Sequence, residues 1–390
     1  MNFNFFSNQQ LFFGPNKLEL LPDIILFHGT SILLLTGSTS FLNSRHWEKL
    51  SQSLKASDIN YHTDKIKREP TPDDIDSVVE RYKEKKIDVV VAIGGGSVLD
   101  AGKAISAMLP KEEPVIQYLE GIGNKIHDGF KIPFIAIPTT SGTGSEATKN
   151  AVISDVGKSG YKKSLRHDNF IPNVALVDPV LTLTCPKNIT AACGMDALTQ
   201  LVESFVSTHS SPMTDALACS GLTGLGNALV HSTLEDPNDI STRSKLSYAS
   251  YLSGLTLANA GLGLVHGFAG VIGGLFGVPH GIVCGTLLAE TTQQNIEVLI
   301  EQGKNNPALL KYAKINRLLI KDSTHKDPVK ESLILAEFLY KWTDLLNIPK
   351  LGSYGIKESD IDNIVAATGQ KFNPVHHTQK KLARILKNRL

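Results

Sequence analysis

Cysteine is scarce in this chain, with only four in 390 residues, at positions 185, 193, 219 and 284. No two of them have the C-x-x-C spacing of a redox or metal motif, and a chain of this length folds without disulfides. The amino terminus also lacks the positive and unbroken apolar segments of an export signal. We therefore expect a cytoplasmic protein.

The chain also has almost no net charge, because 39 Lys and Arg nearly balance 38 Asp and Glu. No global field attracts the protein to nucleic acid or to an anionic membrane, and we expect neither as a partner. Residues 246–289 contain no Asp, Glu, Lys or Arg. Histidine, proline and glycine interrupt this run before it reaches the roughly 18 apolar residues of a membrane span. The run indicates a buried helical core, and the basic tail 379–390 indicates a solvated terminal helix.

Short apolar runs alternate with helical patterns in the first half of the chain. The runs at residues 32–35, 89–93, 134–137 and 174–177 are typical of strands buried on both faces of a parallel sheet. After about residue 187 the strand patterns stop and long helical patterns continue to the end. We expect an α/β fold in which residues 1–186 form a Rossmann-like parallel-sheet domain and residues 187–390 form an all-α domain.

One helix start is well marked between these strands. Thr71 is a capping residue, and Pro72 suits the first helical position. An apolar stripe with helical spacing follows at Ile75, Val78, Val79 and Tyr82. This stripe predicts a helix that covers the sheet.

A glycine-rich segment, IGGGSVLDAGKA (93–104), directly follows the second expected strand. Three glycines allow backbone N–H groups to approach a ligand closely, and a helix that begins at Ser97 would direct its positive end to the same point. The pattern predicts a phosphate site, although Ala104 excludes a Walker A loop. The alternative is a tight strand-to-helix turn that binds nothing.

A second loop, PTTSGTGSEAT (138–148), follows the third expected strand and is rich in small hydroxyl residues and glycine. Open α/β sheets bind ligands at the carboxyl ends of their strands, which makes this loop a second candidate for ligand binding. The alternative is a polar surface loop.

Candidate metal ligands occur in the helical half. In GMDALTQLVES (194–204), Asp196, Gln200 and Glu203 fall on one helical face. His266 and His280 lie in the glycine-rich segment 263–281. One aspartate with two histidines is the composition of a site for Fe(II) and also serves zinc. A single buried histidine is more often a satisfied core residue.

These segments, in this order, resemble the iron-containing (group III) alcohol dehydrogenase family, whose relatives include glycerol dehydrogenase and dehydroquinate synthase. The resemblance covers nearly the whole chain. It also includes FFGPNKLELLP (12–22), EPT (69–71), NVALVDPVLTLTCP (173–186) and the Asn373-Pro374 pair.

The resemblance implies a metal-dependent NAD(P)(H) alcohol dehydrogenase, or aldehyde or ketone reductase, with its cleft between the domains. Homodimers are frequent among such enzymes. At matched positions, Gly94, Gly95, Gly96 and Ser97 would take the pyrophosphate, and Thr139, Thr140, Asn150 and Lys162 would line the nicotinamide end. Asp196, His266 and His280 match three of the four family ligands for Fe(II), with zinc as the alternative metal.

The chain departs from the family pattern at four places. Gln200 occupies the position of the fourth ligand, a histidine, so it is a weak ligand or a hydrogen-bond donor beside the metal. Gly270 replaces a histidine that could relay protons, and Ala289-Glu290 replaces a Pro-His pair. These two changes predict a wider pocket. Gly37 lies where NAD-preferring members often have aspartate, which favours NADP over NAD.

Two other functions stay open. A lyase or cyclase of the dehydroquinate synthase type would share cofactor and metal, but the helical half has no Lys and Arg cluster for a phosphorylated sugar acid. A degenerate, non-catalytic NAD(P)-binding protein would explain Gln200 and Gly270. Retention of Asp196, His266 and His280 argues against that interpretation.

Overall fold

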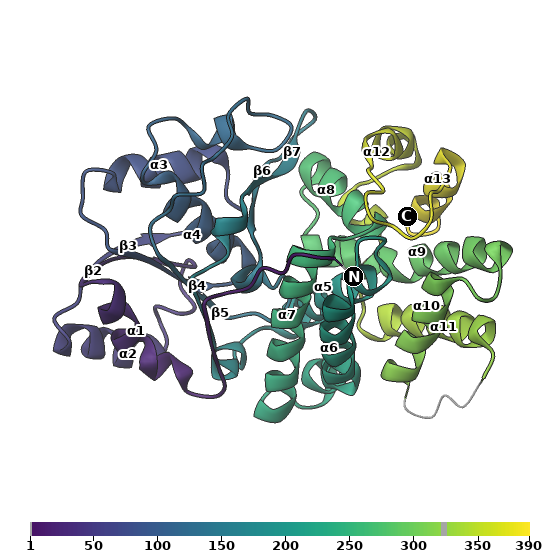
Figure 1. Cartoon of the computed structure of the whole chain (residues 1–390), viewed down its shortest axis with the longest axis horizontal. Helices are drawn as coiled ribbons and strands as arrows, with labels where there is room; N and C mark the ends of the chain where they lie inside the picture. The colour runs from purple at the N-terminus through teal and green to yellow at the C-terminus, as the bar shows by residue number, and fades with distance from the viewer. Residues whose placement is uncertain (1, 321–325) are drawn as a thin grey trace.

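The computed structural model describes residues 2–320 and 326–390 and has two parts side by side, a sheet flanked by helices and a group of helices (Figure 1). The main sheet has six parallel strands in the order β1-β8-β5-β4-β2-β3. Its strands are β1 (Gln10–Phe13), β2 (Ser31–Thr36), β3 (Asn60–Lys65), β4 (Val89–Gly94), β5 (Phe134–Pro138) and β8 (Val174–Val177). The expected parallel sheet is confirmed.

The four expected strands are the inner ones, β2, β4, β5 and β8, and nearly all their residues are buried. The sequence pattern missed both edge strands, β1 and β3, because an edge strand is partly solvated and need not be apolar. It also missed the antiparallel hairpin of β6 (Asn150–Asp155) and β7 (Tyr161–Arg166), which lies outside the main sheet.

Helices cover both faces of the main sheet. The helices of this part are α1 (Leu21–His28), α2 (Arg45–Ala56), α3 (Pro72–Tyr82) and α4 (Gly96–Met108), with short 3-10 turns η1 (Lys17–Leu20), η2 (Val115–Tyr118), η3 (Ser145–Ala147), η4 (Asp168–Phe170) and η5 (Pro179–Thr182). Alternate residues of β2 point to opposite faces, so Leu34 packs in the core with α1 and α2, whereas Leu33 packs with α3 and α4. Thr71 caps α3 with a capping box, as expected.

The second part is helical throughout its described residues. It contains α5 (Lys187–Val206), α6 (Pro212–Val230), the π-helix η6 (His231–Glu235), α7 (Ile240–Ala260), α8 (Leu264–Phe276), α9 (His280–Gln302), α10 (Pro307–Leu319), α11 (Pro328–Leu345), α12 (Ile361–Ala367) and α13 (Gln379–Lys387), with the 3-10 turns η7 (Leu351–Tyr354) and η8 (Glu358–Asp360). The proposed domain boundary, between residues 186 and 187, lies directly before α5. Most residues of α5 are buried, since α6, α7 and α9 all pack against it.

The uncharged run 246–289 forms parts of α7 and α9 and all of α8, and most of its residues are buried. Among the described residues, no individual helix has the length and apolar composition to cross a membrane; α7 and α8 meet the criteria only as a pair, bent by 99° at the break between them. The basic tail is helical, but it is not fully solvated. Leu382, Ile385 and Leu386 of α13 pack into a hydrophobic core.

Candidate active site

A cleft lies beyond the carboxyl end of β4, where the two parts of the molecule meet. Its cavity volume is about 100 Å³. The sheet part contributes Glu69, Pro70, Gly96, Ser97, Asp100, Thr143, Ser145, Thr148, Asn150, Val152 and Lys162, and the helical part contributes Gln200, Leu257 and His280. One space is therefore bordered by the glycine-rich segment and by a candidate metal ligand.

The glycine-rich segment forms the turn from β4 into α4. The helix begins at Gly96, one residue before the expected start, because Gly95 takes the capping position. A Cβ atom on Gly94 would lie 2.6 Å from the side chain of Val98, and one on Gly96 would lie 2.6 Å from that of Thr143. Glycine is thus required at both positions. The first turn of α4 carries no acidic residue, and its positive end, at Gly96 and Ser97, borders the cleft.

Thr139 and Thr140, at the start of the second loop, contact the glycine turn. Thr139 N–H donates to the carbonyl oxygen of Gly94 at 2.9 Å. The Thr140 hydroxyl is 3.5 Å from where a Cβ on Gly95 would lie. Neither threonine is among the described residues that line the cleft. Their contacts shape the glycine turn from behind.

Lys103, in the third turn of α4, holds the second loop in place. Its buried ammonium donates to the carbonyl oxygens of Ser145 and Asn150, at 2.9 and 2.8 Å, and to the hydroxyl of Thr148 at 2.7 Å. Burial lowers the pKa of Lys103 to about 8, against the opposing charge of Asp100. The aspartate and lysine of the GGGSVLDAGKA segment are therefore structural anchors.

Lys162 and Asn150 both line the cleft. The Lys162 ammonium lies 2.6 Å from a carboxylate oxygen of Glu69, and the Ser154 hydroxyl donates to the other oxygen. Burial alone would raise the pKa of Glu69, but Lys162 outweighs that effect and lowers it. Asn150 Oδ1 is buried and has no hydrogen-bond partner among the described residues. It is free to receive a donor from a ligand.

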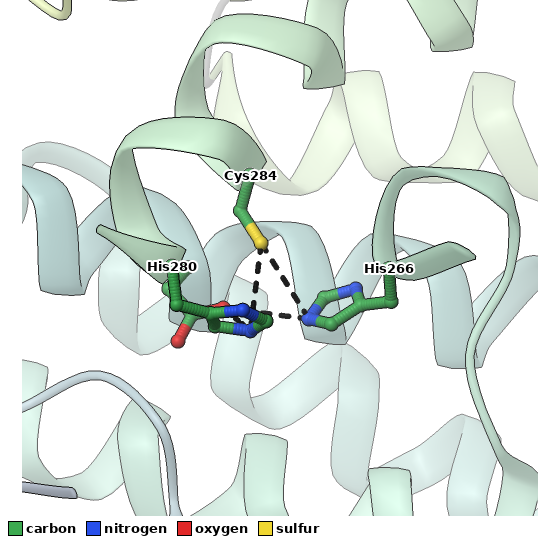
Figure 2. A group of neighbouring side chains, drawn as sticks. His266, His280 and Cys284 are labelled. Atoms are coloured by element: carbon green, nitrogen blue, oxygen red, sulfur yellow. Dashed lines mark hydrogen bonds and ion pairs between the residues drawn. The ribbon is translucent and has the colours of Figure 1, made fainter. Parts of the chain in front are cut away.

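Three helices bring the candidate metal ligands together (Figure 2). Asp196 on α5 has its Oδ1 3.4 Å from Nε2 of His266 on α8 and 3.6 Å from Nε2 of His280 on α9. The Sγ atom of Cys284, one turn after His280, is 3.7 Å from each Nε2. These four donor atoms all lie within 4.8 Å of one another.

The protonation states of Asp196 and His280 suit a cation, whereas Cys284, Asp196 and Glu203 outweigh burial at His266 and raise the pKa of its imidazole. Burial opposes the charge on Asp196, but His280 and His266 outweigh it and lower the pKa of the carboxyl to about 2. Burial lowers the pKa of His280 to about 4, which leaves its imidazole neutral near pH 7. Asp196 Oδ1 has no hydrogen-bond partner among the described residues. A carboxylate and a neutral imidazole are the forms that bind metals, so these residues fit a divalent ion.

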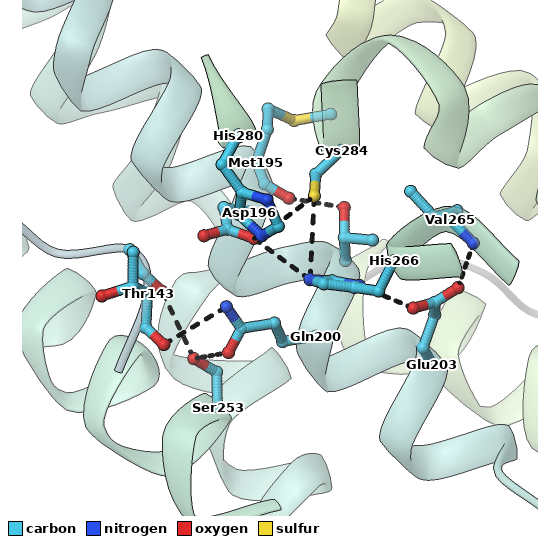
Figure 3. A network of polar contacts seen from close by, with 12 residues as sticks. Thr143, Met195, Asp196, Gln200, Glu203, Ser253, Val265, His266, His280 and Cys284 are labelled. Carbon is cyan, nitrogen blue, oxygen red and sulfur yellow. Dashed lines mark hydrogen bonds and ion pairs between the residues drawn. The ribbon is translucent and has the colours of Figure 1, made fainter. Parts of the chain in front are cut away.

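Glu203, one of the polar residues on the α5 face, orients His266 (Figure 3). Its carboxylate accepts from His266 Nδ1 at 2.7 Å and from the backbone N–H of Val265 at 2.7 Å. With Nδ1 held by Glu203, the ring points its Nε2 atom toward Asp196 and Cys284. Carboxylates commonly hold metal-binding histidines in this way.

Gln200 faces the second loop. Its Nε2 donates to the carbonyl oxygen of Thr143 at 3.3 Å, and its Oε1 accepts from the Ser253 hydroxyl at 3.1 Å (Figure 3). The amide oxygen, which is the only atom of this side chain able to bind a metal, is therefore engaged by Ser253. Gln200 joins α5, α7 and the loop beside the cleft.

Only one of the two changes expected to widen the pocket lies in open space. A Cβ on Gly270 would meet no atom within 4 Å. Ala289 and Glu290 are buried elsewhere in the helical part. Glu290 accepts hydrogen bonds from Tyr340 and Asn388, so its replacement of a histidine does not widen the cleft and that expectation is wrong.

Sequence comparison places both parts of the chain in one family. Residues 8–179 match the family described as iron-containing alcohol dehydrogenase, and residues 190–390 match the carboxy-terminal part of the Fe-containing alcohol dehydrogenase family. Alcohol dehydrogenase 4 of Saccharomyces cerevisiae is 30% identical over 382 residues, which cover 96% of this chain and 95% of the yeast protein. The NAD-dependent methanol dehydrogenase of Bacillus methanolicus is 31% identical over 83% of each chain.

Structural comparison agrees with these matches. The crystal structure of 1,3-propanediol oxidoreductase superposes over all of both chains with a TM-score of 0.89 and 26% identity. Because the matched segments span nearly the whole sequence, the protein belongs to the iron-containing alcohol dehydrogenase family.

Proposed function

We propose that the protein is a metal-dependent alcohol dehydrogenase that transfers hydride between C4 of a nicotinamide cofactor and a small alcohol or its carbonyl product. The observation that carries this proposal is the shared cleft, which is lined by the start of α4 and by His280 of the metal-binding group. The names of the relatives, alcohol and methanol dehydrogenases, support the same reaction. They do not favour the lyase or the non-catalytic alternative.

The residues of the cleft divide between cofactor and metal. Gly94, Gly95, Gly96 and Ser97 would hold the pyrophosphate at the positive end of α4, and Asn150 and Lys162 would form the nicotinamide end. Thr139 and Thr140 support this arrangement through their contacts with the glycine turn. Asp196, His266 and His280 hold Fe(II) or zinc. A bound metal would act as a Lewis acid on the substrate oxygen, and the bound nicotinamide would supply or accept the hydride.

The proton and the cofactor preference depend on two glycines. Gly270 adds no side chain to the cleft, so the substrate hydroxyl exchanges its proton with solvent water or a cofactor hydroxyl. Gly37 follows β2, where a Cβ would meet no atom within 4 Å, and it presents no carboxylate to a 2'-phosphate. NADP is therefore accepted alongside NAD.

The proposal also includes a homodimer and a location in the cytoplasm. The four free cysteines are compatible with that compartment.

The test is oxidation of NADH and NADPH with a panel of aldehydes and ketones, on chelator-stripped protein before and after addition of Fe(II) or Zn(II). We expect turnover only with metal, and none in His280→Ala, which should still bind nucleotide. Tight nucleotide binding without metal-dependent turnover on any carbonyl would refute the proposal. Full activity of His280→Ala would refute the ligand assignment.

A further inference from the structure

The metal-binding group contains a fourth donor that the family pattern does not include. Cys284 follows His280 by four residues, so both side chains project from the same face of α9. The side chain is fully buried, and its Sγ lies 3.7 Å from Nε2 of both His266 and His280 (Figure 2). Cys284 belongs to a hydrophobic core, but its sulfur contacts two imidazole nitrogens at the edge of that core.

Four of the six separations between the donor atoms match those around a single tetrahedral ion, and all six are within 4.8 Å. Donors about 2.0–2.3 Å from zinc lie roughly 3.3–3.8 Å from one another. The Asp196 oxygen lies 3.4 and 3.6 Å from the two imidazole nitrogens, and Sγ of Cys284 lies 3.7 Å from each. All four measured edges fall within the range expected for one ion.

Gln200 is a weaker candidate than Cys284 for the fourth ligand. Its Oε1 accepts from Ser253 and its Nε2 donates to Thr143, so both ends of the amide are used in joining α7 and the second loop to α5. An amide oxygen is also a weaker ligand for a transition metal than a thiolate. Cys284, on α9, therefore supplies the fourth metal ligand in place of the histidine that the family has at position 200 on α5.

We propose that Cys284 binds the metal as a thiolate and completes an Asp-His-His-Cys site that prefers zinc to Fe(II). This inference rests on the metal site of the proposed function. On binding, the Sγ–H bond breaks, its proton passes to solvent, and the sulfur electron pair is donated to the metal. The two negative charges of Asp196 and Cys284 neutralise a divalent ion, which suits a buried site.

The preference for zinc follows from the donor atoms. A thiolate is a soft ligand, and soft ligands select zinc over Fe(II), which also ranks below zinc in general affinity for such sites. Catalytic zinc expands to five ligands, so four protein donors are compatible with a catalytic role.

The test uses cobalt(II) as a probe, because a thiolate ligand gives it an intense near-ultraviolet charge-transfer band that nitrogen and oxygen ligands do not give. Chelator-stripped full-length protein is titrated with cobalt(II), together with Cys284→Ser and Cys193→Ser. Cys193 lies on α5 three residues before Asp196 and serves as the matched control. We expect the band in the wild type and in Cys193→Ser, and visible ligand-field bands alone in Cys284→Ser.

Zinc affinity gives a second readout by competition with a chromophoric chelator. Loss of a group that only orients a ligand costs about 10- to 100-fold in metal affinity, so we expect Cys284→Ser to lose more than about 100-fold. Where that variant does not fold, zinc X-ray absorption of the wild type decides, with one sulfur neighbour expected at about 2.3 Å.

The outcomes separate the two proposals. Cobalt that binds without the charge-transfer band, a band that survives in Cys284→Ser, or a zinc shell of nitrogen and oxygen only would overturn the role of Cys284 and leave the three-ligand site standing. No binding of cobalt or zinc by the wild type would overturn the metal site of the proposed function together with this inference.

Discussion

At the scale of single side chains, the site depends on groups that do not touch the substrate. Glu203 fixes the ring of His266 through a 2.7 Å hydrogen bond to Nδ1. The second oxygen of the carboxylate accepts from Val265 N–H, which locks the side chain at the start of α8. The direction of the Nε2 lone pair is therefore set before any metal arrives.

Glu203→Gln should weaken zinc binding by about 10- to 100-fold, because a neutral amide makes His266 a poorer donor and holds it less firmly. The measurement is a chelator competition, with the exposed Glu301→Gln as the control. Wild-type zinc affinity in Glu203→Gln would show that this hydrogen bond does not tune the site.

Most residues of the candidate metal site, but not all, could be predicted from the sequence. Asp196, His266 and His280 could be proposed from residue types and matched positions, and Glu203 from its place on the helical face. Cys284 was missed because the cysteines were compared only with one another, for C-x-x-C spacing. The i, i+4 relation of Cys284 to His280 was present in the sequence, yet only the packing of α5, α8 and α9 shows that the two side chains meet His266 and Asp196.

At the scale of elements, α4 and the second loop behave as one unit because Lys103 joins them. Its ammonium replaces water with four protein acceptors, and all four belong to residues 145–150. The glycine turn at one end of α4 and the loop that packs against it are thus positioned by the same buried cation.

Lys103→Met should destabilise the protein by about 3 kcal/mol, since the carbonyl acceptors and Asp100 would lose a buried charged partner. Urea unfolding measures this change, and nucleotide titration should show weaker binding because the loop is released. Lys86→Met provides the control, because Lys86 is 88% exposed and its ion pair contributes under about 1 kcal/mol. Equal unfolding midpoints for the two variants would contradict the anchoring role.

Strands were predictable where the sheet is buried on both sides and not where it is open. The runs that became β2, β4, β5 and β8 are apolar because both faces of each strand are covered. β3, with the sequence NYHTDK, is held at the sheet edge by parallel pairing with β2, and that pairing is a tertiary contact without a local pattern.

At the scale of the whole molecule, the junction between the two parts contains a buried acid. Glu146 is 2% exposed and lies in η3, which packs against α7. Burial raises the pKa of its carboxyl from 4.5 to about 7. The folded protein therefore holds a proton on Glu146 that the unfolded chain releases at lower pH.

The contribution of Glu146 to stability should fall as pH rises from about 5 to 7, because in this window the folded state binds more protons at Glu146 than the unfolded state does. Glu146→Gln should lack this part of the decline, so that wild type loses roughly 2 to 3 kcal/mol relative to the variant. Urea midpoints measured from pH 5 to pH 8 test the difference. Parallel curves for the two proteins would mean that Glu146 is ionised in the folded state.

The proposed metal ligands come from three helices, α5, α8 and α9, that are brought together only by folding. A ligand that binds the native state alone adds about 2.7 kcal/mol of stability when its free concentration is 100 times its dissociation constant. Proteases attack chains that open, so metal scarcity would shorten the lifetime of this protein as well as stop its turnover. Its abundance in a cell would then follow the supply of the ion.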